Sequence, residues 1–253
     1  MFIRFLSFLP IIFLHIVMNS QMSFAQAPTT QKVLITGFYD WRDLGTPPEQ
    51  TRCRDNPSCR ILATEGVGPR DFLGPLAQSL RTWNQSQKTK MQIDFELLPV
   101  TWEALGRLSR ERYQIVIHLG LGVYDRFDRI LIEDGAYNLR KGKDAIGTSR
   151  KEVIEPGKPT ILQSPPQVTL GIHRALNTKL PEPFHLVKAT ARKSNAYLCN
   201  STYYEALQSL TQNIKETHQA KKEAYFLHLP HREGQSDRAL SNAVFEVIKA
   251  LLH

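Results

Sequence analysis

Ile115-Val116-Ile117-His118-Leu119-Gly120 is the stretch that decides the fold, because it opens with three consecutive β-branched apolar residues. A strand that is apolar on both of its faces is typical of the centre of a sheet that helices cover on both sides. Gly120 and Gly122 follow the apolar run. We therefore expect Ile115-Val116-Ile117 to be a buried central strand of an α/β protein.

Further strand patterns lie on either side of this run. Val33-Leu34-Ile35-Thr36 is a short apolar stretch, residues 92–100 alternate apolar and polar side chains, and residues 224–229 form another apolar run. Apolar residues at helical spacing lie between these strands. They predict helices over residues 69–83, from Thr101 through Leu108, from Cys199 to Ile214, and over 239–252 with Ser236 as the N-cap.

The alternation of strands and helices predicts a three-layer α/β/α sandwich with a central twisted, mostly parallel sheet. Residues 138–166 differ from the rest, because they are basic, contain glycine and proline, and carry little periodicity. We expect them to form a long surface excursion from a single domain that spans residues 26–253.

The first 25 residues have the features of a secretory signal peptide. Arg4 is their only charge, residues 5–18 are almost unbroken in apolar character, and Ser23-Phe24-Ala25 offers small residues for cleavage. The apolar run is shorter than the ~20 residues that a membrane span needs. We expect a secreted or periplasmic protein without stable membrane insertion after cleavage, the alternative being an uncleaved anchor.

The composition is that of a globular protein with a basic surface. The chain is 42% hydrophobic and 22% charged, with a formal net charge of +8. The basic residues are scattered among acidic ones, and no run of five or six like charges occurs. This distribution gives no footprint for nucleic-acid binding. No metal-ligand spacing or phosphate-binding glycine loop is present, so no metal and no cofactor is expected.

The three cysteines make an odd number for an exported protein. Cys53 and Cys59 lie six residues apart in a stretch rich in turn residues, and an oxidising compartment favours their pairing. Cys199 is then left without a partner. An unpaired thiol of this kind is either a small buried apolar residue or a reactive group, and cysteine counting leaves both open.

Two residues are expected near the carboxyl ends of the strands, where the functional sites of α/β sheets usually lie. Cys199 is expected at the start of a helix and His228 near the end of a strand, and sites form outside the carboxyl ends of such strands. Helix-start N–H groups and a nearby imidazolium both stabilise a thiolate. A third group must orient the imidazole. His118 is expected to be a core residue, and His231 is an alternative base.

Four segments match one known family in order: residues 33–38, 116–121, 197–200 and 226–230. On these segments the chain resembles pyroglutamyl peptidase of the cysteine type, which removes an N-terminal pyroglutamyl residue from peptides. The resemblance implies Cys199 as nucleophile, His228 as general acid and base, and Glu133 as the group that orients His228. Glu133 is followed five residues later by Asn138, as in the family. The residues alone do not distinguish Glu133 from Asp125, Asp128 or Asp134.

The resemblance also implies a peptide or small amide substrate, leaves a homo-oligomer open, and assigns Phe38 and Trp41 to the substrate pocket. The alternative for both aromatic side chains is a place in the hydrophobic core. Several specificity elements depart from the family's pattern. The glycines after Phe38 are gone, an insertion carries the cysteine pair, and Ser194-Asn195 stands where a pair of small residues is usual. An amidase or exopeptidase of altered N-terminal specificity and a catalytically silent binding domain are therefore the alternatives.

Overall fold

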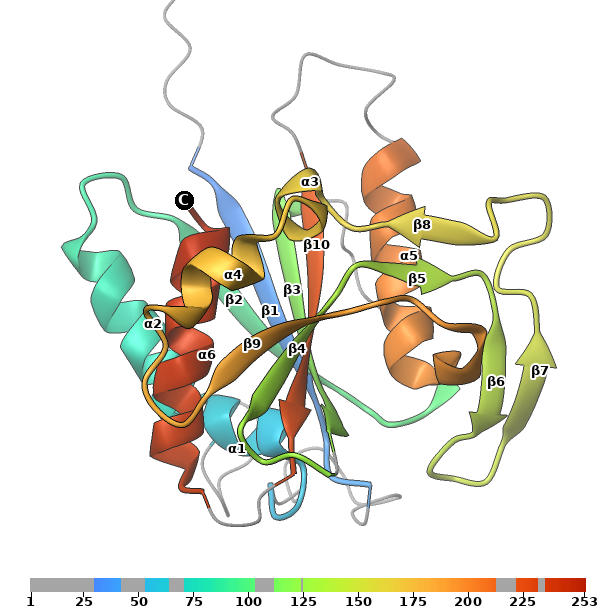
Figure 1. Ribbon diagram of the computed structural model, residues 1–253, viewed down its shortest axis with the longest axis horizontal. Helices are drawn as coiled ribbons and strands as arrows, with labels where there is room; N and C mark the ends of the chain where they lie inside the picture. Colours follow the sequence, from blue (N-terminus) through green and yellow to red (C-terminus); the bar gives the residue numbers. More distant parts are fainter. Residues whose placement is uncertain are drawn as a thin grey trace, which may run out of the picture.

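The computed structural model describes residues 30–41, 53–63, 71–102, 112–123, 125–212, 222–231 and 235–253. Its centre is a six-stranded sheet with the order β2-β1-β3-β10-β4-β9 (Figure 1). The strands are β1 (Lys32–Phe38), β2 (Gln92–Leu98), β3 (Ile115–Val123), β4 (Arg129–Glu133), β9 (His185–Ala189) and β10 (Glu223–Pro230). All neighbouring pairs run parallel except β4 and β10, so the prediction of a mostly parallel sheet is confirmed.

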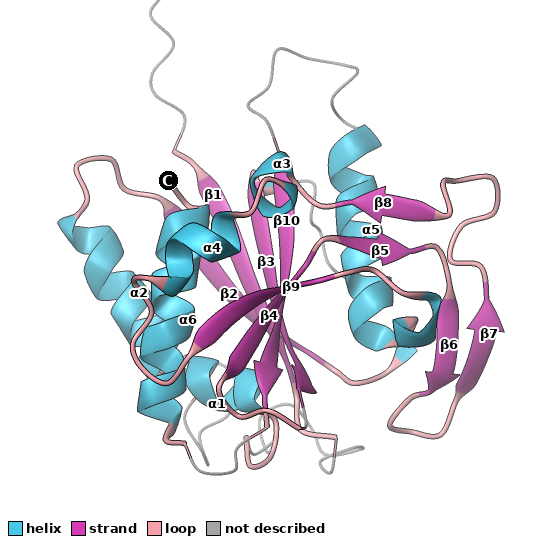
Figure 2. Ribbon diagram, viewed as in Figure 1, coloured by secondary structure: helices cyan, strands magenta, loops and turns pink. Residues whose placement is uncertain are grey.

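Helices cover both faces of this sheet (Figure 2). The helices on one face are α1 (Pro57–Leu62), α2 (Pro75–Ser86), α4 (Ile172–Asn177) and α6 (Asp237–Leu251), and α5 (Leu198–Gln212) lies on the other. The short helix α3 (Pro166–Thr169) precedes α4. Successive side chains of β1 enter different hydrophobic cores on the two faces of the sheet. Val33 and Ile35 pack in the core on the α2 and α6 side, and Leu34 packs in the core on the α5 side. The predicted three-layer α/β/α sandwich is thereby confirmed.

Helix starts follow the chemistry of their first residues. Ser236 caps α6 by accepting a hydrogen bond from the Ala239 N–H, as predicted. The helix predicted over 69–83 begins later, at Pro75, because proline suits the first helical position and restrains the residue before it. Most of the helix expected from Thr101 through Leu108, residues 103–108, lies outside the described residues, as do residues 1–25.

Residues 138–166 are more ordered than the expected surface excursion. β5 (Gly135–Tyr137) pairs with β8 (Ile161–Gln163), and β6 (Arg140–Lys143) pairs with β7 (Ser149–Glu152), each pair antiparallel. The buried Asn138 side chain holds the long connection by bonding to the backbone of Glu155 and Lys158. Strands of three or four residues are too short to show a period in the sequence, which is why the pattern was missed.

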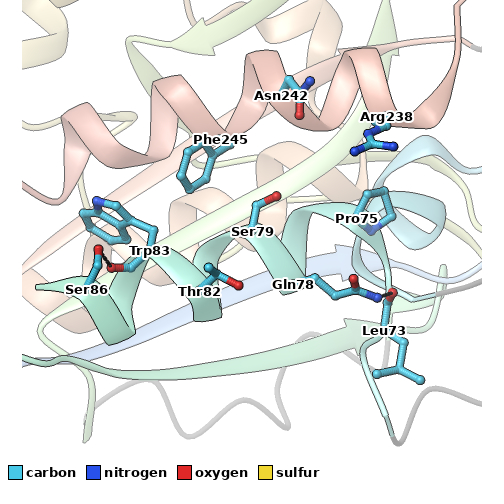
Figure 3. A pocket seen from close by; sticks show the side chains of 10 residues that line it. All are labelled: Leu73, Pro75, Gln78, Ser79, Thr82, Trp83, Ser86, Arg238, Asn242 and Phe245. Carbon is cyan, nitrogen blue, oxygen red and sulfur yellow. Dashed lines mark hydrogen bonds between the residues drawn. The ribbon is translucent and has the colours of Figure 1, made fainter.

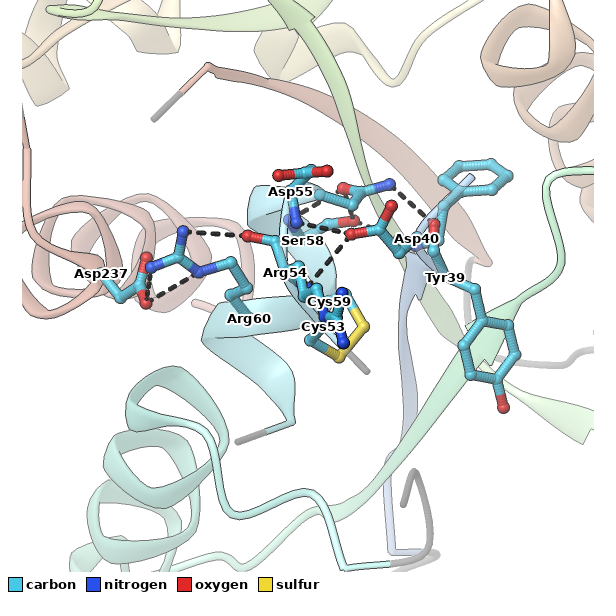
Figure 4. The surroundings of a disulfide bond; sticks show 11 residues. Tyr39, Asp40, Cys53, Arg54, Asp55, Ser58, Cys59, Arg60 and Asp237 are labelled. Carbon is cyan, nitrogen blue, oxygen red and sulfur yellow. Dashed lines mark hydrogen bonds and ion pairs between the residues drawn. A yellow bond between two sulfur atoms is a disulfide. The ribbon is translucent and has the colours of Figure 1, made fainter. Parts of the chain in front are cut away.

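A disulfide joins Cys59, within α1, to Cys53, which precedes the helix (Figure 4). The buried carboxylate of Asp40 accepts hydrogen bonds from the backbone N–H groups of Arg54 (3.1 Å) and Asp55 (2.5 Å). The Ser58 hydroxyl accepts the N–H of Phe38 at 3.0 Å. These bonds attach the disulfide segment and α1 to the carboxyl end of β1.

Candidate functional site

Cys199 lies in the first turn of α5, as the sequence predicts. Its half-buried side chain rests against β3 at Gly120, where an added Cβ would lie 2.9 Å from Sγ and 2.8 Å from a ring carbon of Phe226. Gly120 therefore makes room for the sulfur. Among the described residues Cys199 is the cysteine outside the disulfide.

His228 lies on β10 within the sheet, and its ring is buried. Its Nδ1 lies 2.8 Å from Oε1 of Glu133, which is buried at the end of β4. An added Cβ at Gly122 would lie 2.3 Å from Cδ2 of the ring and 2.9 Å from Nε2. The ring thus occupies the space that a side chain at position 122 would need.

The glycines of β3 shape the candidate site, a role that the sequence analysis did not identify. The apolar run predicted a strand over residues 115–117 with the glycines after it, but β3 continues to Val123 and contains both. Glycine inside a strand weakens it and often marks the close approach of another group. That signal was available, and it points to the two side chains that lie over Gly120 and Gly122.

The electrostatic surroundings of His228 favour its charged form. Burial alone would lower its pKa, but hydrogen bonds to Cys199 and Glu133 and the negative charges of both groups outweigh burial and raise the pKa to about 10. The imidazole is therefore protonated at neutral pH and lies between the Cys199 sulfur and the Glu133 carboxylate. Such an arrangement can supply a nucleophile and a proton donor at one place.

Glu133 is held by a polar network that the sequence analysis missed. Asn195 Nδ2 donates to Oε1 at 3.5 Å, and the Ser164 hydroxyl donates to the Glu133 carbonyl at 2.6 Å. Ser164 Oγ also lies 2.5 Å from the Tyr203 hydroxyl oxygen, which lies 3.2 Å from the Ala224 carbonyl oxygen. Burial raises the pKa of Tyr203, so the phenol stays neutral.

Asn200, next to Cys199, fixes the start of α5. Its Oδ1 accepts the N–H of Tyr137 at 2.7 Å, and its Nδ2 donates to the carbonyls of Tyr137 and Leu139. The helix start is thereby attached to β5, which follows Glu133 along the chain. The orientation of the first turn of α5, and with it the thiol, depends on this amide.

The other candidates take no part in the hydrogen bonds among the three central side chains. Phe38 is buried in the core cluster against which Cys199 packs, whereas Trp41 is half-buried in a turn after β1. His118 is fully buried and hydrogen-bonded to Thr36 at 2.6 Å, as expected of a core histidine. His231 lies beyond the end of β10.

The four candidate carboxylates can now be distinguished. Asp128 pairs with Arg126, Asp134 accepts a backbone N–H, and Asp125 is exposed. In the described part of the chain, Glu133 is the one whose carboxylate reaches His228.

Two hollows adjoin the central side chains. One of about 10 Å³ lies beside Cys199 and is also lined by Asn195, Arg192 and His228. A second of about 490 Å³ lies beside His228 and Glu133 and is not lined by Cys199. Neither hollow is lined by Phe38 or Trp41.

A larger hollow of about 680 Å³ lies between α2 and α6, on the opposite face of the sheet from α5 (Figure 3). Its lining includes Trp83, Arg238 and Phe245 and contains no histidine or cysteine. The described residues contain no group of three or more metal-ligating side chains, and no described helix is long and apolar enough to span a membrane.

Solved structures with the same fold were found. A pyrrolidone carboxyl peptidase from Thermococcus litoralis is 20% identical over 88% of this chain and 94% of its own, with a TM-score of 0.59. Pyroglutamyl peptidase I from Bacillus amyloliquefaciens is 18% identical over 88% and 96%, with a TM-score of 0.58. A pyrrolidone carboxyl peptidase from Thermus thermophilus is 24% identical over 86% and 98%, with a TM-score of 0.53.

No family model matches the sequence, and no curated protein matches it. At these identities the likeness establishes a shared three-dimensional fold.

Replacement of Gly122 by alanine is expected to displace the His228 ring, because the new Cβ would overlap it. A displacement of ~1 Å in a catalytic group costs ~100-fold in rate, so alkylation of Cys199 by iodoacetamide should slow to a similar degree. Leu121→Ala, a change on the opposite face of the same strand, is the control for general weakening of β3. Equal alkylation rates in Gly122→Ala and wild type would contradict this role.

The raised pKa of His228 predicts a pH-dependent contribution to stability. An unfolded histidine has a pKa of ~6.5 and the folded one about 10, so the charged ring stabilises the fold fully below pH ~6.5 and progressively less towards pH ~10. Glu133→Gln removes one cause of the raised pKa. The loss of unfolding free energy in Glu133→Gln, measured by urea denaturation, should therefore be largest near pH ~6.5 and shrink towards pH ~10. A loss that grows with pH would contradict the assignment.

Proposed function

We propose that this chain is an exported cysteine exopeptidase of the pyroglutamyl peptidase family, which hydrolyses the amide bond after an N-terminal pyroglutamyl residue. The observation that carries the proposal is that His228 on β10 contacts both Cys199 at the start of α5 and Glu133 at the end of β4, within a fold found in pyrrolidone carboxyl peptidases. The domain proposed for this activity is residues 26–253, and no metal or cofactor takes part in the proposed reaction.

In the first half of the reaction, the Cys199 sulfur attacks the carbonyl carbon of the pyroglutamyl residue. A carbon–sulfur bond forms and the carbonyl oxygen becomes an oxyanion, which the unpaired N–H groups of the first turn of α5 are placed to stabilise. His228 then donates its proton to the departing amine. The carbon–nitrogen bond breaks, and a thioester with Cys199 remains.

In the second half, water attacks the thioester while the now neutral His228 accepts its proton. The carbon–sulfur bond breaks, pyroglutamic acid leaves, and the thiolate–imidazolium pair is restored. Glu133 accepts a hydrogen bond from the Nδ1–H of His228 throughout, which directs Nε2 towards the sulfur. Glu133 therefore acts as a positioning residue through His228.

One observation favours a second candidate, a related amidase or exopeptidase with a different N-terminal preference. Asn195 stands where the family usually has a small residue, and its side chain contacts Glu133 and lines the hollow beside Cys199. That hollow, at about 10 Å³, has room for about one water molecule. An acyl group that is smaller than the pyroglutamyl group, or that binds in a different position, would fit this lining better.

The activity is tested with a pyroglutamyl coumarin amide under reducing conditions. We expect turnover by the wild type and a loss of ~10⁴-fold or more in kcat for Cys199→Ala and for His228→Ala. Rapid alkylation of Cys199 without turnover would instead support the second candidate. If neither turnover nor rapid alkylation of Cys199 is observed, both enzyme proposals are contradicted and a catalytically silent binding domain remains.

We propose export on the basis of residues 1–25, whose charge and apolar pattern are those of a signal peptide. Expression of the full chain should yield a periplasmic or extracellular protein that begins near Gln26. N-terminal sequencing of that protein is the measurement. A first residue of Met1 on membrane-bound protein would contradict cleavage and support an uncleaved anchor.

A further inference from the structure

The hollow of about 490 Å³ beside His228 has a basic rim. Arg192 and Lys188 line it, and the neutral side chains of Thr190, Ser194 and Asn195 complete its polar wall. We propose that this hollow binds the departing part of the substrate and that Arg192 and Lys188 select a peptide with a carboxylate near the cleaved bond. The inference rests on the proposed peptidase function and deepens it.

The position of the hollow relative to the three central side chains assigns it to the departing side. The cleaved bond lies between the Cys199 sulfur, which takes the acyl group, and His228, which protonates the departing amine. The smaller hollow is lined by both Cys199 and His228, whereas the larger is lined by His228 and Gly122 without Cys199. The chain that continues from the departing amine therefore enters the larger hollow.

The charges around the hollow favour an anion. Its one carboxylate, Glu133, already faces the charged ring of His228 at 2.8 Å. Within the described residues, the side chains of Arg192 and Lys188 take part in no ion pair or hydrogen bond. Both are exposed at the rim, where they can reach a carboxylate on a bound peptide.

The backbone that carries Arg192 is fixed relative to the catalytic pair. Asp134, next to Glu133, accepts the N–H of Ala191 through Oδ1 at 2.8 Å and donates its own N–H to the carbonyl of Ala189 at 2.8 Å. The Arg192 carbonyl accepts the N–H of Asn195 at 2.9 Å. Arg192 also lines the small hollow beside Cys199, so this residue adjoins both hollows.

The test compares pyroglutamyl-glutamate amide with pyroglutamyl-glutamine amide, which differ in charge but hardly in shape. We expect kcat/KM to favour the glutamate peptide by about fivefold, as two exposed cations allow, and the preference to decline in ~0.5 M salt. Arg192→Gln should abolish most of the preference. Lys193→Gln, an exposed neighbouring lysine that lines neither hollow, is the matched control and should retain it. Equal rates on both peptides, or a preference that survives in Arg192→Gln, would overturn the assignment.

A second readout does not depend on peptide cleavage. Iodoacetate and iodoacetamide alkylate a thiolate by the same displacement of iodide and differ in charge. Arg192→Gln should lower the ratio of iodoacetate to iodoacetamide rates at Cys199 about threefold or more, whereas Lys193→Gln should leave it unchanged. If neither peptide is cleaved, the proposed activity fails, yet a lowered ratio still supports the anion site and an unchanged ratio overturns it.

Discussion

The reversal of β4 against β10 is the constraint on which the site depends. In this antiparallel pair His228 lies opposite Leu131, and Leu227 opposite Ile132. Glu133 is therefore the diagonal neighbour of His228 on the same face of the sheet, within reach of a long side chain. In a parallel pair the end of β4 would lie elsewhere, and the buried imidazole would lose the carboxylate that helps to keep it charged. A buried charge without such a partner is costly.

The strand β3, which pairs with the other edge of β10, contributes to the site through two glycines. β3 places Gly120 opposite His228 and lets the ring extend over Gly122. The sulfur of Cys199 descends from α5 onto Gly120. The His228 ring thus contacts the Glu133 carboxylate on one side, and on the other it occupies space that the glycines of β3 leave free. The antiparallel neighbour β4 and the parallel neighbour β3 together position the His228 ring, and the start of α5 places the Cys199 thiol next to it.

The sequence predicts those parts of this arrangement that local rules control. The apolar runs identified β1, β3 and β10, and Ser236 marked the start of α6. Cys199 and His228 stood out because a helix start and a strand end concentrate chemistry. Glu133 could not be chosen from the residues alone, because its contact with His228 depends on a reversed strand 95 residues earlier in the chain. Ser164 and Asn195 reach Glu133 across 31 and 62 residues, and no short pattern encodes such contacts.

The same sheet explains how one chain holds both a disulfide and an unpaired thiol. Cys53 and Cys59 are buried in the core on the α1, α2 and α6 side, whereas Cys199 packs against the core on the α5 side. The central strands lie between the two sulfur environments, so Cys199 cannot attack the disulfide without opening the sheet. Exchange of disulfides requires direct access of a thiolate to a sulfur of the bond. The three-layer architecture therefore keeps the disulfide and the unpaired thiol of this chain on opposite faces of the sheet.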